Sequence, residues 1–218
     1  MNHQNPGPLY IKDCTLIALA TGKRAQNLRE LREYLRVIST NSIYYHFWGG
    51  LLRPRFDDPE YHNDFAIWAA HSIHNKALAE RLAVIDPVAF MSPEDLRTEI
   101  LDVIEESLDE TDFPVWARRD DQFEFIQHQI VVFDTSKTVE NPEYLKDMLP
   151  QLSLGSLFFH FIDARRRNEN SLDDFQNWLI QFGSKYKRMC ETIDAIDPYF
   201  SGLKQLREAL VNSVRTTS

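Results

Sequence analysis

Two histidines lie in the middle of the most apolar segments of the chain. His46 lies within Ile43–Trp48, and His160 lies within Leu157–Ile162. A buried imidazole needs hydrogen-bond partners, and a free imidazole can act as a base or bind a metal. These two positions are therefore the first candidates for chemistry.

Each histidine has an arginine seven positions further on, which is two turns along one helix face if the helix continues. Each also has an aspartate near the predicted start of the next helix, which could bond the imidazole or cap that helix. Two interpretations remain open: a pocket for an anionic or hydroxylated small ligand, or a core histidine with an Arg–Asp ion pair nearby. The candidate residues are His46, Arg53 and Asp64 in the first set and His160, Arg167 and Asp174 in the second.

Aromatic and further histidine residues surround the first set. Trp68, with Trp48, Phe65 and Tyr61, fits either a core or a stacking wall for a sugar or nucleobase. Tyr45 is a further candidate, through its hydroxyl group. His71 and His74 are spaced i, i+3 and could join His46 around a metal ion. Since no equivalent pair follows His160, this cluster is a minor alternative.

Familiar catalytic motifs are absent from the sequence. There is no Gly-rich phosphate loop, His-Glu-x-x-His, Cys-x-x-Cys or Gly-x-Ser-x-Gly. We therefore predict no catalytic residues, no bound metal and no cofactor.

The chain resembles itself at an offset of 114 residues. Ten identities fall in a gap-free window of 33 residues, Thr21–Arg53 against Thr135–Arg167, and both histidines are among them. We therefore predict a mainly α fold made by tandem duplication, with two helical modules of roughly 100 residues related by a pseudo-two-fold axis. The predicted boundaries are 9–108 for the first module, 109–122 for a linker and 123–218 for the second module.

Each predicted module contains four to five helices. The opening segments, 9–20 and 123–133, are ambiguous: β-branched residues in the second favour a short strand, whereas alanines in the first favour a helix. Ser42 and Ser156 are predicted N-caps of the second helix, and Pro150 is predicted to shorten or kink the helix before it. Phe113, Val115 and Trp116 predict a linker that packs down.

Composition narrows the function further. The net charge of −9 and pI near 5.3 disfavour nucleic-acid binding. Two cysteines at non-matching positions predict no disulfide framework. No apolar run is long enough to span a membrane, and no signal peptide is evident. We therefore expect a cytoplasmic protein.

Four segments resemble an uncharacterised prokaryotic family, catalogued as a domain of unknown function, whose members often carry this module twice. They read TGKxAxNLxEL at Thr21–Leu31, SIYYHF at Ser42–Phe47, NDFAxW at Asn63–Trp68 and AERLxxIDP at Ala79–Pro87. The second half departs from them, with phenylalanines for both tyrosines. The resemblance implies no activity; it suggests an accessory role in carbohydrate metabolism of the glycosyltransferase or trehalose type.

The sequence as a whole predicts a non-catalytic interaction or regulatory module. Its expected partner is a protein or a small anionic or hydroxylated ligand, and a homo-oligomer is compatible with the sequence. The rival hypothesis is a metal- or histidine-dependent enzyme centred on His46. A further rival is the carbohydrate-linked accessory protein.

Overall fold

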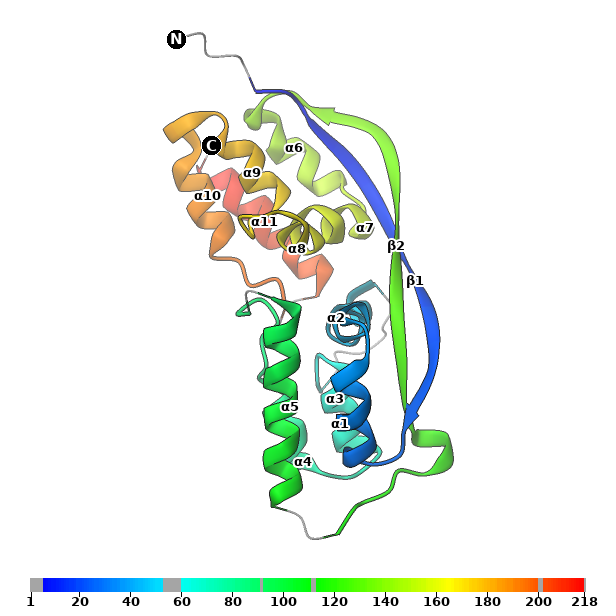
Figure 1. The fold of residues 1–218 in the computed structure, drawn as a ribbon. Helices are drawn as coiled ribbons and strands as arrows, with labels where there is room; N and C mark the ends of the chain where they lie inside the picture. Colours follow the sequence, from blue (N-terminus) through cyan, green and yellow to red (C-terminus); the bar gives the residue numbers. More distant parts are fainter. Residues whose placement is uncertain (1–5, 53–59, 91, 111–112, 200–201, 218) are drawn as a thin grey trace. The chain divides into compact units, whose positions relative to one another are not determined.

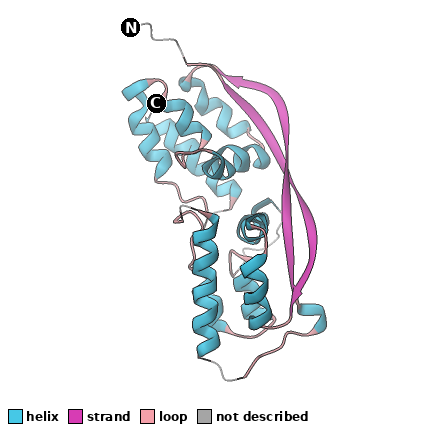
Figure 2. Ribbon diagram, viewed as in Figure 1, coloured by secondary structure: helices cyan, strands magenta, loops and turns pink. Residues whose placement is uncertain are grey.

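The computed structural model describes residues 6–52, 60–90, 92–110, 113–199 and 202–217. Two long strands dominate it: β1 (Leu9–Ala25) and β2 (Phe123–Val139) pair as a two-stranded antiparallel sheet (Figures 1 and 2). Glycine at position 22 adopts a φ of +76° within β1, a left-handed conformation that costs glycine little.

The helices follow each strand in two series. The first series is α1 (Leu28–Val37), α2 (Thr40–Trp48), α3 (Asp64–His71), α4 (Lys76–Ala83) and α5 (Pro93–Asp109). The second is α6 (Leu145–Met148), α7 (Leu154–Leu157), the π-helix η5 (Phe158–Asp163), α8 (Ala164–Arg167), α9 (Asp174–Ile180), α10 (Lys187–Asp194) and α11 (Leu203–Thr217). Short 3-10 turns join them: η1 (Gly49–Leu52), η2 (Arg119–Asp121), η3 (Pro142–Tyr144), η4 (Leu149–Gln151) and η6 (Gly183–Tyr186).

The chain packs into two compact units, and both strands contribute to each. The central unit is Leu16–Gln129, and the terminal unit combines Met1–Thr15 with Ile130–Ser218. The start of β1 therefore belongs with α6–α11, and the start of β2 belongs with α1–α5. Each strand contributes residues to both units, and the boundaries 9–108, 109–122 and 123–218 stay a prediction.

The predicted fold class is wrong. We expected a tandem pair of helical modules with at most one short strand each, and the structure instead has two 17-residue strands paired in a sheet beside the helices. Most of the regular elements are nevertheless helical. The alanines of β1 misled the prediction because helix propensity is a weak prior that tertiary pairing overrides. The strand that pairs with β1 lies about a hundred residues away in sequence.

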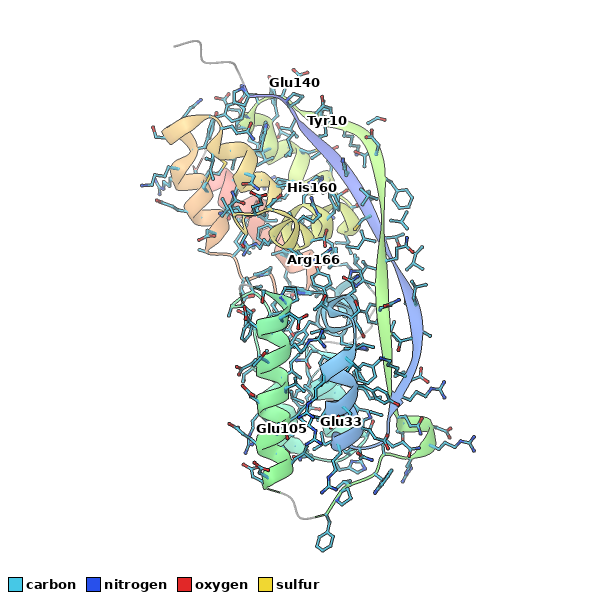
Figure 3. All side chains as sticks on the ribbon, viewed as in Figure 1. Tyr10, Glu33, Glu105, Glu140, His160 and Arg166 are labelled. Carbon is cyan, nitrogen blue, oxygen red and sulfur yellow. The ribbon has the colours of Figure 1, made fainter. Side chains whose placement is uncertain are left out.

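In the central unit, amphipathic helices enclose an apolar core. Leu31 and Leu35 of α1 are fully buried, and α1 packs against α5. Arg32 and Arg36 of α1 both bond Glu105 of α5, at 3.0 and 2.8 Å; Figure 3 labels Glu105 beside Glu33. These charge pairs border the apolar contact between the two helices.

Helix starts follow local capping chemistry, with one correction. Ser92 and Asp95 form a reciprocal capping box at the start of α5. The N-caps of α2 and α7 are Ser39 and Ser153, three residues before the predicted Ser42 and Ser156. Both pairs of serines have good capping chemistry, and the first of each pair begins the helix.

The terminal unit has shorter helices. Pro150 interrupts the first of them, which passes from α6 into the 3-10 turn η4 at Leu149, as predicted. α10 packs against α11 and α9. No described helix combines the length and apolarity that crossing a membrane requires.

Candidate functional site

His46 is bonded at both ring nitrogens inside the central unit. Its Nδ1 lies 2.9 Å from Oδ2 of Asp64, the first residue of α3. Its Nε2 accepts the backbone N–H of Ile126 in β2 at 3.1 Å. Because Nε2 accepts, the ring proton is on Nδ1 and is donated to the carboxylate. The imidazole is 4% exposed and therefore forms a buried bridge between α2, α3 and β2.

His160, which Figure 3 labels, has the same kind of partners inside the terminal unit. Its Nδ1 lies 2.7 Å from Oδ2 of Asp174 at the start of α9. Its Nε2 accepts the backbone N–H of Lys12 in β1 at 2.9 Å. Asp64 and Asp174 thus partner the histidines, while Asn63 and Asp173 cap the two helices.

The predicted histidine, arginine and aspartate of the second set do meet. Arg167 Nη2 donates to Asp174 Oδ2 at 3.1 Å, and Arg167 Nε donates to Asp163 Oδ2 at 2.8 Å. The guanidinium also lies 3.9 Å from the ring centroid of Phe159. In the first set, Arg53 lies outside the described residues.

Charge pairing in the terminal unit stabilises the ionised aspartate. Burial acts to raise the pKa of Asp174, but the hydrogen bond from His160 and the charge of Arg167 outweigh burial and hold that pKa below its usual range. The carboxylate of Asp163 is almost fully buried and is bonded by Arg166 and Arg167. The set is therefore an internally neutralised network.

The aromatic candidates are core residues. Tyr45 and Trp68 are 4% and 5% exposed. Trp68 Nε1 donates to the carbonyl of Asp121 at 2.9 Å, and the Tyr45 ring meets His46 edge-on. Neither ring therefore presents a face on which a sugar or nucleobase could stack.

Hydroxyl groups bond the same strands. Ser42 Oγ donates to the carbonyl of Ile126 at 2.7 Å, and Thr21 Oγ1 donates to that of Phe125 at 2.6 Å. In the terminal unit, Thr135 Oγ1 donates to the carbonyl of Ile11. Together with the histidines, these groups position the start of each strand within its unit.

The surroundings of His71 and Cys14 bear on metal binding and on thiol reactivity. His71 is exposed, with Glu60 at 4.0 Å, and within the described ranges no three His, Cys, Asp or Glu residues are grouped to hold a metal. Burial, with the charges of Asp163 and Asp13, raises the pKa of the Cys14 thiol to about 12. A thiol with that pKa is not a nucleophile near neutral pH.

Comparison with known proteins identifies the family. The model of a family described as "Family of unknown function (DUF5752)" matches residues 6–215. The chain belongs to this family. The family resemblance inferred from the sequence is therefore confirmed, and it supplies no activity.

One solved structure is similar to this DUF5752 member over almost its whole length. It is OrfY from Thermoproteus tenax, with a TM-score of 0.84 and 28% sequence identity. The match covers 97% of this chain and 96% of that chain. No curated protein matches the chain.

A buried polar cluster in the terminal unit was missed by sequence reasoning. Asp173 is fully buried, with Arg165 Nη2 at 3.8 Å from its Oδ2. Burial raises the pKa of Asp173 to about 7, although the Gln176 N–H and Arg165 act to lower it. Asn63 is the N-cap of α3 in the central unit, where Asp173 is the N-cap of α9. The aspartate in place of an asparagine was the one sequence feature that could have indicated the buried cluster.

The prediction that the linker packs down through its large apolar side chains is wrong. Phe113, Val115 and Trp116 are 81%, 51% and 58% exposed, so these side chains do not pack down. The segment borders a small cavity of about 30 Å³. The cavity lining joins α1, the α3–α4 connection and the end of α5. We call Phe113–Trp116 with this cavity the apolar ledge.

Proposed function

We propose that this DUF5752 member is a non-catalytic interaction module that binds a protein partner through the apolar ledge. The observation that carries the proposal is the row of large apolar side chains exposed at Phe113, Val115 and Trp116. Contiguous exposed apolar surface on a globular protein commonly marks an interaction site.

The state of the histidines supports a non-catalytic role. A general base needs a free lone pair, and both His46 and His160 use Nε2 to accept a backbone N–H. Their Nδ1 protons are committed to aspartates. Catalysis or metal binding at either ring would require breaking the bond that holds a strand to its helices.

A backbone hydrogen bond at Ala117 fixes the C-terminal end of the apolar ledge. This bond reduces the conformational entropy that the segment would lose when a partner binds. The N–H of Ala117 donates to the carbonyl of Gln26 at 2.7 Å, and Ala117 is buried. Side chains presented from a fixed backbone lose less entropy on binding than those of a free segment. Trp116, immediately before this anchor, therefore serves as a ready contact residue.

The cavity size favours a protein over a small molecule at this ledge. Small-molecule sites typically have volumes of about 300–1,000 Å³, whereas this cavity holds about 30 Å³. A sugar phosphate or nucleotide does not fit, but part of one apolar side chain from a partner does. Leu28 and Ile73 provide apolar lining for such a group.

Charge beside the ledge indicates the chemistry of the partner. Arg29 lines the cavity, and Arg118 and Arg119 follow Trp116; within the described ranges none of these exposed guanidinium groups has an ion-pair partner. Asp120 and Asp121 balance Arg118 and Arg119, so the positive charge beside the ledge is that of Arg29. We therefore assign the partner an apolar anchor flanked by carboxylates.

A photocrosslinking experiment tests this proposal. Phe113 is replaced by benzoyl-phenylalanine in the full chain, which is expressed in its native cells and irradiated. The matched control places the same group at Val84, which is 74% exposed on the same unit. We expect one defined protein adduct from position 113 and none from position 84.

The charge of the partner is tested in the same assay. Arg29→Glu should lower the adduct yield about fivefold, since reversing a rim charge changes binding by about 1 kcal/mol. Equal labelling from positions 113 and 84, or no adduct from position 113, contradicts the proposal.

A further inference from the structure

Both backbone groups of Gln26 are hydrogen-bonded, and one of the two bonds holds the apolar ledge. The residue lies between Ala25, the last residue of β1, and Asn27, the N-cap of α1. Its carbonyl accepts the N–H of Ala117 at 2.7 Å. Its own N–H donates to Oε2 of Glu30 at 2.8 Å. Glu30 and Ala117 therefore hold the same residue.

The side chain of Glu30 reaches further than a capping-box residue does. In α5 the residue at the same third position, Asp95, accepts the N–H of its own N-cap, Ser92, at 3.1 Å. Glu30 instead passes its N-cap and bonds Gln26, whose N–H is not one of the four free donors of the helix. The bond therefore orders the chain that precedes α1 rather than the helix itself.

The start of α1 also forms part of the ledge. Leu28 and Arg29, the first two residues of the helix, line the cavity, as does Leu108 of α5. α1 begins at the same end of the central unit at which α5 finishes (Figure 1). The bond from Gln26 to Glu30 therefore links the residues that line the cavity to the segment that carries the exposed aromatic side chains.

We propose that Glu30 is a positioning residue for partner binding at the apolar ledge. Its carboxylate fixes Gln26, and Gln26 fixes Ala117 and with it the exposed Trp116. This inference rests on the proposed function of the ledge. A backbone that is ordered before binding loses less entropy when the partner arrives. Loss of the Glu30 bond should therefore weaken binding although every side chain of the ledge is still present.

Two substitutions separate the reach of the Glu30 side chain from its charge. Glu30→Asp keeps a negative charge at the positive end of the α1 dipole, but an aspartate at the third position reaches only the N-cap, as Asp95 does. Glu30→Gln keeps an oxygen acceptor at the full reach. We expect Glu30→Asp to lose the bond to Gln26 and Glu30→Gln to retain it.

The matched control is Asp95→Ala. It removes a comparable bond from a carboxylate to a backbone N–H at a helix start of the same unit. Asp95 lies in the first turn of α5, whereas the ledge borders the other end of that helix. A loss of stability that is unrelated to the ledge should therefore show in this variant as well.

Amide hydrogen exchange of the free full chain tests the positioning directly. In Glu30→Asp, exchange at Gln26 and Ala117 should be about fivefold faster than in the wild type, because one hydrogen bond contributes a factor of this order. Exchange at both amides should keep its wild-type rate in Glu30→Gln and in Asp95→Ala. Unchanged exchange at Ala117 in Glu30→Asp would overturn the inference without any use of the partner.

Photocrosslinking from position 113 measures the effect on binding, with the yield divided by the amount of folded chain. Glu30→Asp should lower the yield about threefold or more, whereas Glu30→Gln and Asp95→Ala should keep the wild-type yield. A wild-type yield in Glu30→Asp, or an equal loss in Asp95→Ala, would overturn the inference and leave the proposed function intact. No adduct from the chain with native Glu30 would contradict the proposed function and the inference with it.

Discussion

Two adjacent aspartates in the terminal unit show how environment decides the behaviour of a residue. Asp174 is ionised and paired with His160 and Arg167, and its pKa is lowered. Asp173 is fully buried beside it, and burial raises its pKa to about 7. The two carboxylates therefore make the free energy of unfolding depend on pH with opposite signs.

Asp173→Asn should stabilise the protein in mild alkali. A raised folded-state pKa gives stability that is fully present below the unfolded pKa of 3.8 and is lost as pH rises through about 7. Asparagine keeps the capping oxygen and carries no charge, as Asn63 does in the central unit. We expect the free energy of unfolding at pH 8 to rise by about 2–4 kcal/mol, measured by urea denaturation.

The pH profile provides the control for this prediction. Between pH 4 and pH 8 the wild type should lose stability relative to Asp173→Asn, and the two should converge near pH 4. Parallel profiles, or a variant less stable at pH 8, would show that the buried charge costs nothing.

Part of the residue-scale site could be predicted from sequence. Candidate partners for the histidines followed from apolar context and spacing, and the structure brings His46 to Asp64 and His160 to Asp174. The backbone N–H groups of Ile126 and Lys12 that complete each site could not be predicted. Such partners leave no trace in residue type, because every non-proline residue carries the same N–H group.

At the scale of elements, β1 is held closely against α7. Sγ of Cys14 donates to the carbonyl of Gly155 at 3.3 Å. A Cβ at position 155 would collide with Oδ1 of Asp13 and the carbonyl oxygen of Cys14. Glycine therefore permits the contact between the strand and the helix.

Gly155→Ala should destabilise the terminal unit. Alanine gains about 1 kcal/mol of helix propensity over glycine, but a backbone carbonyl cannot rotate away as a side chain can. We expect a net loss of at least about 2 kcal/mol in the free energy of unfolding. The control is Gly7→Ala, where a Cβ meets nothing within 4 Å and stability should change by less than about 0.5 kcal/mol. Equal effects of the two substitutions in thermal denaturation would refute the close approach.

Prediction of the elements succeeded where their signals are local. The capping box at Ser92 and the proline break at Pro150 follow from neighbouring residues alone. The opening segment 9–20 was ambiguous because both a helix and a strand fit its composition. Pairing with β2 decided it as a strand, and nothing within the segment encodes that partner.

At the scale of the whole molecule, the central unit contains the start of β2 as well as α1–α5. Phe123 and Phe125 of β2 contact His46, and Phe123 stacks on Phe65 at 5.0 Å. All of these residues belong to Leu16–Gln129. A fragment ending at residue 108 therefore lacks part of the core of its own unit.

Fragment stability should follow the compact units. We expect Leu16–Gln129 to unfold cooperatively by circular dichroism, because it contains both strand segments of the central unit. We expect the fragment 9–108 to be markedly less stable, and 123–218 to need residues 6–25 added as a peptide to supply the N–H of Lys12 to His160. If 9–108 proved as stable as Leu16–Gln129, β2 would not be part of that core.

The sequence by itself determined the capping box at Ser92, the apolar helix faces and the net charge, because each depends on residue type and short spacing. It left Asp64 and Asp174 open between bonding the histidines and capping a helix. Only the tertiary structure decided that the opening segments are long strands and that each strand serves two compact units. It also decided that both imidazoles are fully bonded and that the linker aromatics are exposed. Those outcomes depend on backbone groups and burial brought together over about a hundred residues, which local patterns do not contain.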